Sequence, residues 1–366
     1  NVNEEQMRMA AIMLAQLNRQ ASVPNCNLQE INAIRNKLLR EIERLEKDEM
    51  LDVLSGHTNA ESSKHHEDPT LEPKIKVENL KHVLRDDPSA VVFKEDLNTK
   101  LKRIRQSSPY GDHPNWDIVS VVVKASQDMR QEHLACQLIR CMRDIWREEG
   151  VDVWVSDKHN VLVTPNGGLI QAIPNTCSLH SLKKSQLESG LEWVFKEYFS
   201  CRFSTNIDTA RLNFTKSLCG YSLLTYILQI KDRHNGNILL DNEGHIVHID
   251  FGFMLSNAPG GHVYSGGVET APFKLTADYL DVLLVDDFTS MFTKGLLAVR
   301  KHQDRLLALI NVYSDDQDDP CTRLPCLQSG LDAVTVALKQ RLFPAQTDKQ
   351  VHQQVEKLFT HSAMNT

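Results

Sequence analysis

The sequence reads KDRHNGN at residues 231–237 and HIDFG at residues 248–252. Between them lie two short apolar runs around the turn residues DNEG, a pattern that predicts a β-hairpin over residues 238–249. A hairpin returns the chain on itself, so we expect Asn237 and Asp250 to lie at the same end of it. Amide and carboxylate oxygens are ligands that Mg²⁺ prefers, which makes this end a candidate metal site.

The spacing of the polar residues narrows the chemistry. Protein kinases carry H-R-D-x-x-x-x-N followed by D-F-G, with the asparagine five residues after the aspartate. Here Asn237 has the same spacing from Asp232, and D-F-G begins at Asp250. In phosphoryl transfer such groups orient and deprotonate an acceptor hydroxyl and hold Mg²⁺ against the ATP phosphates. The joint spacing therefore indicates phosphoryl transfer, and alternation along a strand predicts that His248 also points to this site.

The other signatures of a protein kinase do not occur. No G-x-G-x-x-G precedes the apolar run IVSVVVK that ends at Lys124, and no A-P-E follows D-F-G. On the predicted next helix an acid, Glu132, stands only eight residues after this lysine. The sequence therefore indicates kinase chemistry in a different arrangement.

Composition limits the class of protein. The 366 residues include 41 Lys and Arg against 48 Asp and Glu, a net charge of −7, so no nucleic-acid partner is expected. With 41% hydrophobic and 24% charged residues, the balance is that of a globular protein. No apolar run approaches the roughly 18 residues of a membrane span, so we expect any membrane contact to be peripheral. The chain begins with Asn rather than Met and is predicted to be a fragment.

The cysteines indicate reduced thiols rather than a metal site. None of the eight forms a C-x-x-C pair, and they are spread through apolar stretches, as is typical of a cytosolic protein. The nearest approach to a zinc site is Cys321 and Cys326 with His302 upstream, which lacks ligand spacing. We therefore predict no metal–thiolate site.

The patterns along the chain predict an α+β fold with two lobes, a small β-rich N-lobe and a larger, mainly helical C-lobe. A helical segment at 1–54, expected to pack on the N-lobe, precedes a linker at 55–80 that contains small, charged and proline residues. The N-lobe is predicted at 81–175 and the C-lobe at 176–366.

Individual elements follow from hydrophobic periodicity and turn residues. Ser126 is expected to cap a helix that ends at Gly150. Strands are predicted at 118–124, 151–155, 160–164 and 168–173. The other predicted helices cover 96–106, 184–199, 207–229, 275–285, 287–312, 330–342 and 348–360. The last of them carries an apolar stripe with Val351 and Val355, which favours core packing.

Together these motifs resemble the phosphatidylinositol 3-/4-kinase superfamily, and within it the type III beta phosphatidylinositol 4-kinases. The resemblance spans roughly residues 95–360 and is carried by DRHNGN with HIDFGF, SPYG at 108–111, SVVVK at 120–124 and DMRQE at 128–132. It implies a lipid kinase that transfers the γ-phosphate of ATP to the 4-hydroxyl of phosphatidylinositol, giving phosphatidylinositol 4-phosphate. The implied cofactors are ATP and Mg²⁺, with Mn²⁺ as an alternative ion.

The resemblance also implies which residues contact the nucleotide. The expected phosphate contacts are Lys124 and a turn without glycine repeats, Ser107, Ser108, Pro109 and Tyr110. The expected adenine contacts are the hinge residues Gln171, Ala172 and Ile173 and the flanking side chains Leu239 and Ile249. Glu132 is expected to be the acidic residue deep in the pocket.

The catalytic loop is implied at 231–237 and the activation segment at 250–276. Asp232 and His234 are expected to serve the acceptor hydroxyl, and which of them takes the proton is left open. Asn237 and Asp250 are expected to hold Mg²⁺.

The activation segment bears on the substrate. Beyond D-F-G it contains four glycines, Gly260, Gly261, Gly266 and Gly267, and Lys274 is its only firm positive charge. A phosphorylated headgroup needs several Lys or Arg side chains to offset its charge, so one lysine fits unphosphorylated phosphatidylinositol. The alternative is a solvated loop, with the substrate recognised elsewhere.

Some positions depart from the family pattern. Gln171 stands where Glu is common at the hinge, Lys158 stands where an aromatic residue of the pocket is expected, and Gln127 replaces an acid after the strand. The segment 281–294 is shorter than the corresponding segment of the family pattern.

Two rival classes are left open. A phosphatidylinositol 3-kinase or a related protein kinase would keep the site and change the acceptor. A nucleotide-binding pseudokinase that serves as a scaffold would be expected to lack at least one of four residues, all of which are present: Lys124, Asp232, Asn237 and Asp250. The resemblance further implies a cytoplasmic enzyme, peripheral on Golgi-type membranes, whose adaptor proteins and small GTPases bind mostly outside this chain.

Overall fold

Two small antiparallel sheets and a set of helices make up the described part of the chain. The structure is a computed structural model that describes residues 97–188, 193–259, 270–313 and 323–365. The chain divides into two units, residues 1–70 and residues 71–366, and every described residue belongs to the second unit. The predicted helical segment at 1–54, the linker at 55–80 and the activation-segment glycines Gly260, Gly261, Gly266 and Gly267 lie outside the described residues.

The first sheet is built around a tight hairpin. Its strands are β1 (Val121–Ala125), β2 (Val161–Thr164) and β3 (Gly167–Gln171), in the order β1-β3-β2. Thr164 pairs with Gly167, so two residues close the predicted turn. Gly167 pairs with Ala125 on β1, and a Cβ at Gly167 would lie 2.0 Å from the carbonyl oxygen of Lys124, so only glycine fits there.

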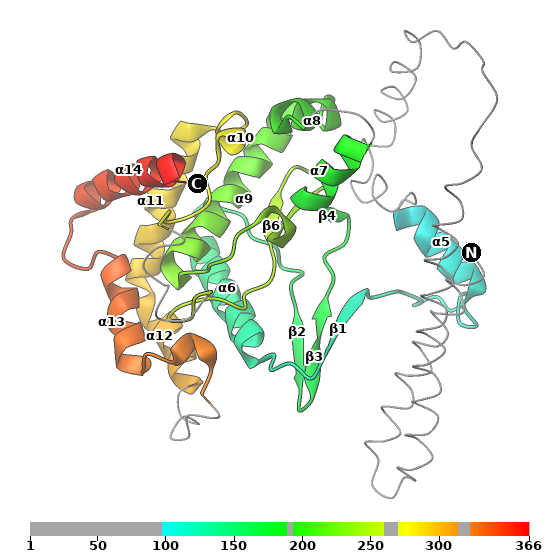
Figure 1. The fold of residues 1–366 in the computed structure, drawn as a ribbon, viewed down its shortest axis with the longest axis horizontal. Helices are drawn as coiled ribbons and strands as arrows, with labels where there is room; N and C mark the ends of the chain where they lie inside the picture. The colour runs from blue at the N-terminus through cyan, green and yellow to red at the C-terminus, as the bar shows by residue number, and fades with distance from the viewer. Residues whose placement is uncertain (1–96, 189–192, 260–269, 314–322, 366) are drawn as a thin grey trace, which may run out of the picture. The chain divides into compact units, whose positions relative to one another are not determined.

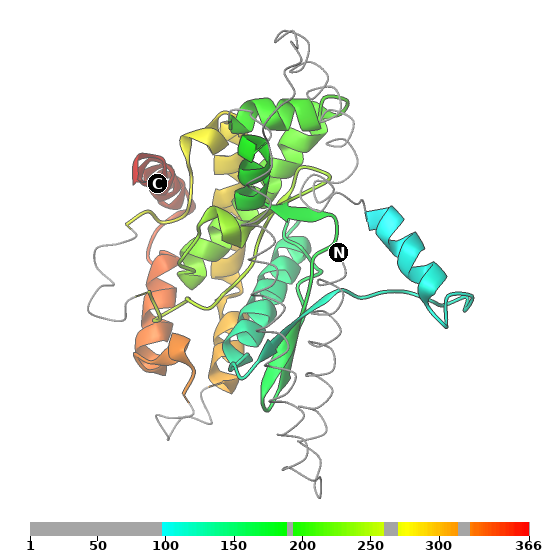
Figure 2. The same cartoon turned by 45° about the vertical axis from the view of Figure 1, so that its right-hand side comes forward.

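Helix α6 (Arg130–Glu148) follows β1 and packs against β2 on one side and against α11 and α12 on another (Figures 1 and 2). Its core face carries Leu134, Leu138 and Met142, which recur at helical spacing and are fully buried. The helix ends before Gly150, whose φ of +63° closes it as predicted. The predicted cap at Ser126 is wrong.

Ser126 lies four residues before the helix and has a left-handed φ of +58°. Its N–H donates to the carbonyl of Asn166, in the turn between β2 and β3. The residue therefore turns the chain out of β1, and the helix begins later, after Met129 and without a side-chain cap.

The strand predicted at 151–155 does not form. The N–H of Trp154 donates to the carbonyl of Lys216, and the N–H of Ser156 donates to the hydroxyl of Tyr221, so this segment bonds to helix α9 (Ile207–Leu228). Gly220 permits the approach, because a Cβ there would lie 2.4 Å from the Trp154 carbonyl oxygen. Residues 151–155 have the alternating apolar pattern of a strand, but the segment packs against a helix instead of pairing in a sheet.

The second sheet carries the predicted hairpin. Its strands are β4 (Thr176–Ser178), β5 (Ile238–Asp241) and β6 (Ile246–His248), in the order β4-β5-β6. The sequence pattern did not indicate strand β4, which pairs with the edge of β5 that faces away from β6. The hairpin of β5 and β6 confirms the prediction.

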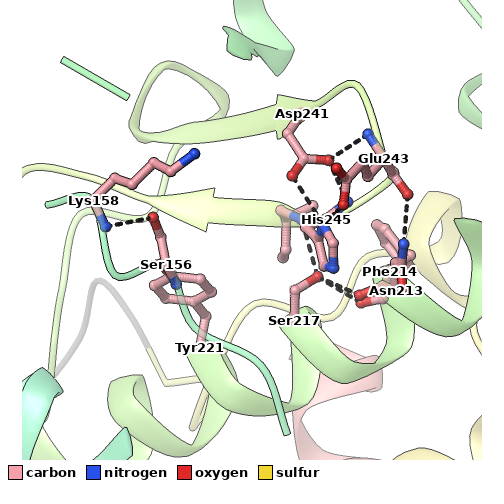
Figure 3. A network of polar contacts seen from close by, with 10 residues as sticks. Ser156, Lys158, Asn213, Phe214, Ser217, Tyr221, Asp241, Glu243 and His245 are labelled. Carbon is pink, nitrogen blue, oxygen red and sulfur yellow. Dashed lines mark hydrogen bonds and ion pairs between the residues drawn. The ribbon is translucent and has the colours of Figure 1, made fainter. Parts of the chain in front are cut away.

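Polar contacts tie this hairpin to helix α9 (Figure 3). Asp241 Oδ1 accepts hydrogen bonds from the N–H groups of Glu243 and His245, both at 2.8 Å, which closes the turn. Ser217 on α9 accepts the N–H of Ile246 at 2.9 Å, and Asn213 donates to the Glu243 carbonyl at 2.9 Å. The hairpin that leads into Asp250 is therefore fixed to the longest helix of the described residues.

The remaining elements are mainly helical. They are α5 (Leu97–Ser107), α7 (Leu179–Glu188), α8 (Phe195–Arg202), α10 (Ala277–Leu280), α11 (Val285–Lys301), α12 (Gln303–Val312), α13 (Leu331–Arg341), α14 (Asp348–Asn365) and the 3₁₀ turns η1 (Asn235–Asn237) and η2 (Pro325–Leu327). The predicted helix at 287–312 is two helices that meet at His302, and the one at 184–199 is also two. The predicted helix at 275–285 is a single turn. These corrections leave the predicted α+β class confirmed.

The C-terminal helix α14 packs on the core, as its apolar stripe predicts. Val351 and Val355 are buried, and the ring of Phe359 meets that of Phe288 on α11 at 5.7 Å between centroids. Among the described residues no helix is long and apolar enough to cross a membrane.

Candidate active site

A cavity of about 670 Å³ is lined by both sheets and by α6. Many of the predicted site residues line it: Lys124, Glu132, Gln171, Ala172, Ile173, Asn237, Leu239, Ile249 and Asp250. The structure thus brings together residues from β1, α6, β3, β5 and the segment after β6.

The cavity has two apolar walls. Ile170 and Val122 come from the first sheet, whereas Leu239 and Ile249 come from the second sheet and the residue that follows it. Leu239 is held in register by its pairing with Val247. Apolar side chains on facing walls suit a flat aromatic base.

The predicted hinge offers a backbone donor at one position. The N–H of Gln171 donates to Asn160 and the N–H of Ala172 to Ser120. In the described part of the chain, the N–H of Ile173 has no such bond, while its carbonyl accepts the Thr176 hydroxyl at 2.8 Å. Ile173 N–H is therefore the hinge donor that a ligand could use.

The catalytic loop is folded on itself. Asp232 has a φ of +63°, and the Asn237 side-chain N–H₂ donates to its carbonyl at 3.0 Å. The N–H of Gly236 donates to His234 Nδ1 at 3.0 Å. The other ring nitrogen, Nε2, lies 3.9 Å from Asp232 Oδ2, and both side chains are about half exposed. Asp232 and His234 thus lie together but do not line the cavity.

Arg233 joins the catalytic loop to the start of the activation segment. Its guanidinium donates to the carbonyls of Lys231 (2.9 Å), Ile249 (2.8 Å) and Asp250. It also lies over the ring of Phe251, 5.8 Å from the centroid. Sequence reasoning missed this role, although Arg233 stands between the motif residues.

Asn237 and Asp250 fit the chemistry of a Mg²⁺ site. Because the amide N–H₂ of Asn237 is used within the loop, its Oδ1 is the atom left for a cation. Asp250 adds a carboxylate on the same cavity. The described residues contain no cluster of three or more His, Cys, Asp or Glu, which is the cage that a dedicated all-protein site needs. Mg²⁺ needs no such cage, since one or two oxygen ligands and substrate phosphates suffice.

Glu132 holds the backbone that follows Asp250. Its Oε2 accepts the N–H of Phe251 at 2.8 Å. The preceding residue, Gln131, donates to the carbonyls of Phe251 (3.1 Å) and Gly252 (2.6 Å). Sequence reasoning placed Glu132 in the pocket but gave no sign of Gln131, since these contacts span about 120 residues.

Lys124 does not pair with Glu132, whereas the corresponding lysine of a protein kinase pairs with a glutamate on the next helix. Over the described ranges its ammonium forms no ion pair, and the two oxygens of Glu132 are used by Phe251 and His159. Lys124 is half-buried in the cavity wall. An unpaired ammonium at this place is suited to a phosphate.

The prediction that His248 points to the site is wrong. The ring is buried and stacks on Tyr221 with 4.8 Å between centroids. Burial, with Arg233 and Lys274 nearby, lowers its pKa well below 6.5. Strand β6 ends at His248 and Asp250 has a φ of +62°, so the two-residue alternation on which the prediction rested does not continue.

The expected aromatic position of the pocket is filled by a neighbouring residue. Lys158 is exposed and does not line the cavity, whereas the imidazole of His159 does. Although Lys158 is not aromatic, the cavity wall therefore still contains an aromatic ring, that of His159.

The structure does not bring the turn Ser107–Tyr110 to the cavity. Ser108 Oγ accepts the N–H of Tyr110 and the indole N–H of Trp116, both at 3.2 Å, so the turn is formed. Ser108 lines a separate hollow with Arg105 and Gly111. The phosphate-loop role of Ser107, Ser108, Pro109 and Tyr110 stays a prediction.

The fold and the site are those of a kinase-like domain. Residues 118–317 match the family model of phosphatidylinositol 3- and 4-kinase. The chain belongs to that family, which confirms the resemblance noted in the sequence.

Curated relatives narrow the likeness further. The chain is 41% identical over 337 residues to phosphatidylinositol 4-kinase pik1 of Schizosaccharomyces pombe, covering 87% of this chain and 38% of that protein. It is 39% identical over 279 residues to phosphatidylinositol 4-kinase beta of Xenopus tropicalis, covering 75% and 33%. To phosphatidylinositol 4-kinase PIK1alpha of Candida albicans it is 34% identical over 389 residues, covering 99% and 36%. The chain spans about a third of the length of these relatives.

Proposed function

We propose that this chain is the catalytic domain of a lipid kinase that transfers the γ-phosphate of ATP to the 4-hydroxyl of phosphatidylinositol. The observation that carries the proposal is the hairpin of β5 and β6, which brings Asn237 and Asp250 to one cavity with Lys124. The relatives named phosphatidylinositol 4-kinases supply the substrate class.

The cavity is proposed to hold ATP. The base lies between the apolar walls that Leu239 and Ile249 help to form, and Ile173 N–H meets its edge. Lys124 contacts a phosphate oxygen. Asn237 Oδ1 and the Asp250 carboxylate hold Mg²⁺, or Mn²⁺ as an alternative. When bound there, the metal would supply positive charge to offset that of the transferring phosphoryl group.

The acceptor hydroxyl is proposed to meet Asp232 and His234. Because His234 Nδ1 accepts the N–H of Gly236, the proton of the neutral ring is on Nε2, which leaves the ring no free lone pair for a base. Asp232 is therefore the group that takes the proton, and His234 Nε2–H orients the acceptor. The inositol oxygen bonds to the γ-phosphorus, the bond to the leaving oxygen of ADP breaks, and the proton passes to Asp232.

An unphosphorylated headgroup suits the charge of the activation segment, where Lys274 is the only Lys or Arg. A phosphatidylinositol 3-kinase or a related protein kinase is the main rival, because the site chemistry is the same. A pseudokinase is disfavoured, since Lys124, Asn237 and Asp250 all face the cavity. A Golgi-type peripheral membrane location and recruitment by adaptor proteins and small GTPases rest on the resemblance alone.

The test is transfer from labelled ATP to phosphatidylinositol vesicles, with the product headgroup resolved by position. We expect label at the 4-position. Label at the 3-position, or only on protein, would contradict the proposed acceptor but would leave the proposed site chemistry in place. Absence of transfer with intact ATP binding would favour the scaffold.

A further inference from the structure

His159 is a buried histidine at the cavity that has no part in the proposed reaction. His159 lies between the segment that packs on α9 and strand β2, and its side chain lines the cavity. Only 9% of the residue is exposed. Its ring nitrogen Nε2 lies 3.2 Å from Glu132 Oε1, and Glu132 is itself 8% exposed. The two form a buried pair within the wall.

The same carboxylate controls the backbone next to the proposed metal ligand. Glu132 Oε2 accepts the N–H of Phe251, the residue after Asp250, at 2.8 Å. The Phe251 ring meets the His159 ring edge-on, with 5.4 Å between centroids and 83° between planes. One imidazole therefore touches both the acceptor of the Phe251 N–H and the Phe251 side chain.

A buried carboxylate needs donors for both of its oxygens, or it turns toward water or takes up a proton. Phe251 supplies one donor and His159 supplies the other. Without His159, Oε1 of Glu132 would be left without this donor, and the carboxylate would lose the orientation that keeps Oε2 on the Phe251 N–H. The N–H of the peptide that follows Asp250 would then lack a fixed acceptor, while Arg233 would still hold the carbonyl of that peptide and Gln131 the two carbonyls after it.

We propose that His159 is a positioning residue, which donates from Nε2 to Glu132 and so fixes the peptide after Asp250 and the direction of the Asp250 carboxylate. The inference rests on the proposed function, because it concerns the same cavity. His159 acts through Glu132 and touches neither the proposed nucleotide phosphates nor the acceptor.

A purely structural role is the competing explanation. His159 Nδ1 is buried and has no hydrogen-bond partner among the described residues, which is unfavourable for a core side chain. An apolar residue would fill the same space without that cost. The presence of an imidazole here therefore indicates that its other nitrogen, on Glu132, is the one used.

The experiment compares His159→Gln with His159→Leu in the full chain. Gln places an N–H close to the position of Nε2, whereas Leu fills the space and cannot donate. We expect His159→Leu to lower kcat and weaken Mg²⁺-dependent ATP binding, each by about 10- to 100-fold. Losses of this size are usual when a residue that helps to orient a metal ligand is removed. We expect His159→Gln to recover most of both.

The matched control is His133→Leu on α6. His133 is half-buried and bonds to the Val161 carbonyl and to Gln137, away from the cavity lining. We expect it to change thermal stability and leave kcat and ATP binding near wild type.

The proposal is overturned if His159→Leu keeps the wild-type kcat and Mg²⁺ dependence, or if His159→Gln is as impaired as His159→Leu. Should His159→Leu fail to fold, His159→Asn replaces it, because its shorter side chain does not reach Glu132. In a Glu132→Gln background, replacing His159 should add little further loss, and full additivity would exclude action through Glu132. Calorimetric ATP binding needs no turnover, so it tests His159 even where the proposed lipid substrate proves wrong.

Discussion

The ammonium of Lys274 donates a 2.7 Å hydrogen bond to Asn235 Oδ1 and a 3.0 Å bond to the carbonyl of Arg233. Lys274 lies near the end of the activation segment, whereas Asn235 and Arg233 belong to the catalytic loop. The residue predicted from sequence as a substrate contact thus also holds the loop that carries Asp232 and His234. Lys274 therefore supports the catalytic loop, and its contact with the headgroup stays a prediction.

Replacing Lys274 by Met should lower kcat more than it raises KM for phosphatidylinositol. The lost bonds free the turn around Asn235, and mispositioned catalytic groups cost about 10- to 100-fold. Initial rates over a range of vesicle concentrations separate the two constants. Lys294→Met, an exposed lysine on α11, is the control. A rise in KM with an unchanged kcat would mean that Lys274 contacts the headgroup and does not support the loop.

Asp250→Asn should lower turnover strongly and leave the fold intact. Asp250 has a φ of +62°, which Asn tolerates, so the backbone keeps its conformation while the carboxylate is lost. We expect kcat to fall by about 10²- to 10³-fold, with unfolding curves that match the wild type. Removal of divalent ions by a chelator should abolish wild-type transfer. Normal activity of the variant would exclude Asp250 as a metal ligand.

The parts of the site that sequence could predict are local. The β5–β6 hairpin and the spacing of Asp232, Asn237 and Asp250 are written in one continuous segment, where turn residues and alternation decide the structure. Lys124 and the residues expected to contact adenine were predicted from the family resemblance, and they line the cavity.

The contacts that hold the site are not local. Glu132 and Gln131 meet the segment after Asp250 across about 120 residues, and no periodicity encodes such a pairing. The strand predicted at 151–155 failed for the same reason, because a helix later in the chain takes its hydrogen bonds. His248 was misplaced because a single left-handed residue interrupts the alternation.

Gly244→Ala should destabilise the hairpin strongly. Gly244 has a φ of +94°, and an added Cβ would lie 2.8 Å from the Ala210 carbonyl oxygen and 3.0 Å from its Cα, both on α9. Positive φ costs an L-residue about 1–2 kcal/mol, and overpacking adds about 1–3 kcal/mol. Gly150→Ala is the matched control, since its φ is +63° and nothing lies within 4 Å of the added Cβ. If chemical denaturation showed that both variants lose the same free energy of unfolding, the contact between Gly244 and α9 would not be tight.

Alkaline pH should destabilise the protein through its buried thiols. Burial raises the pKa of Cys136 from 9.0 to about 12, and that of Cys326 to about 12 as well. Above pH 9 the unfolded chain loses these protons while the folded chain keeps them, so the unfolded state is favoured as pH rises from about 9 to 12. Below pH 9 both states are protonated and the thiols add no pH dependence. Denaturation at pH 8 and pH 10.5 should therefore show a smaller pH dependence for Cys136→Ala than for the wild type, even though the variant starts less stable because of the cavity it leaves. Parallel losses in the two proteins would mean that the Cys136 thiol ionises as readily in the folded state as in the unfolded one.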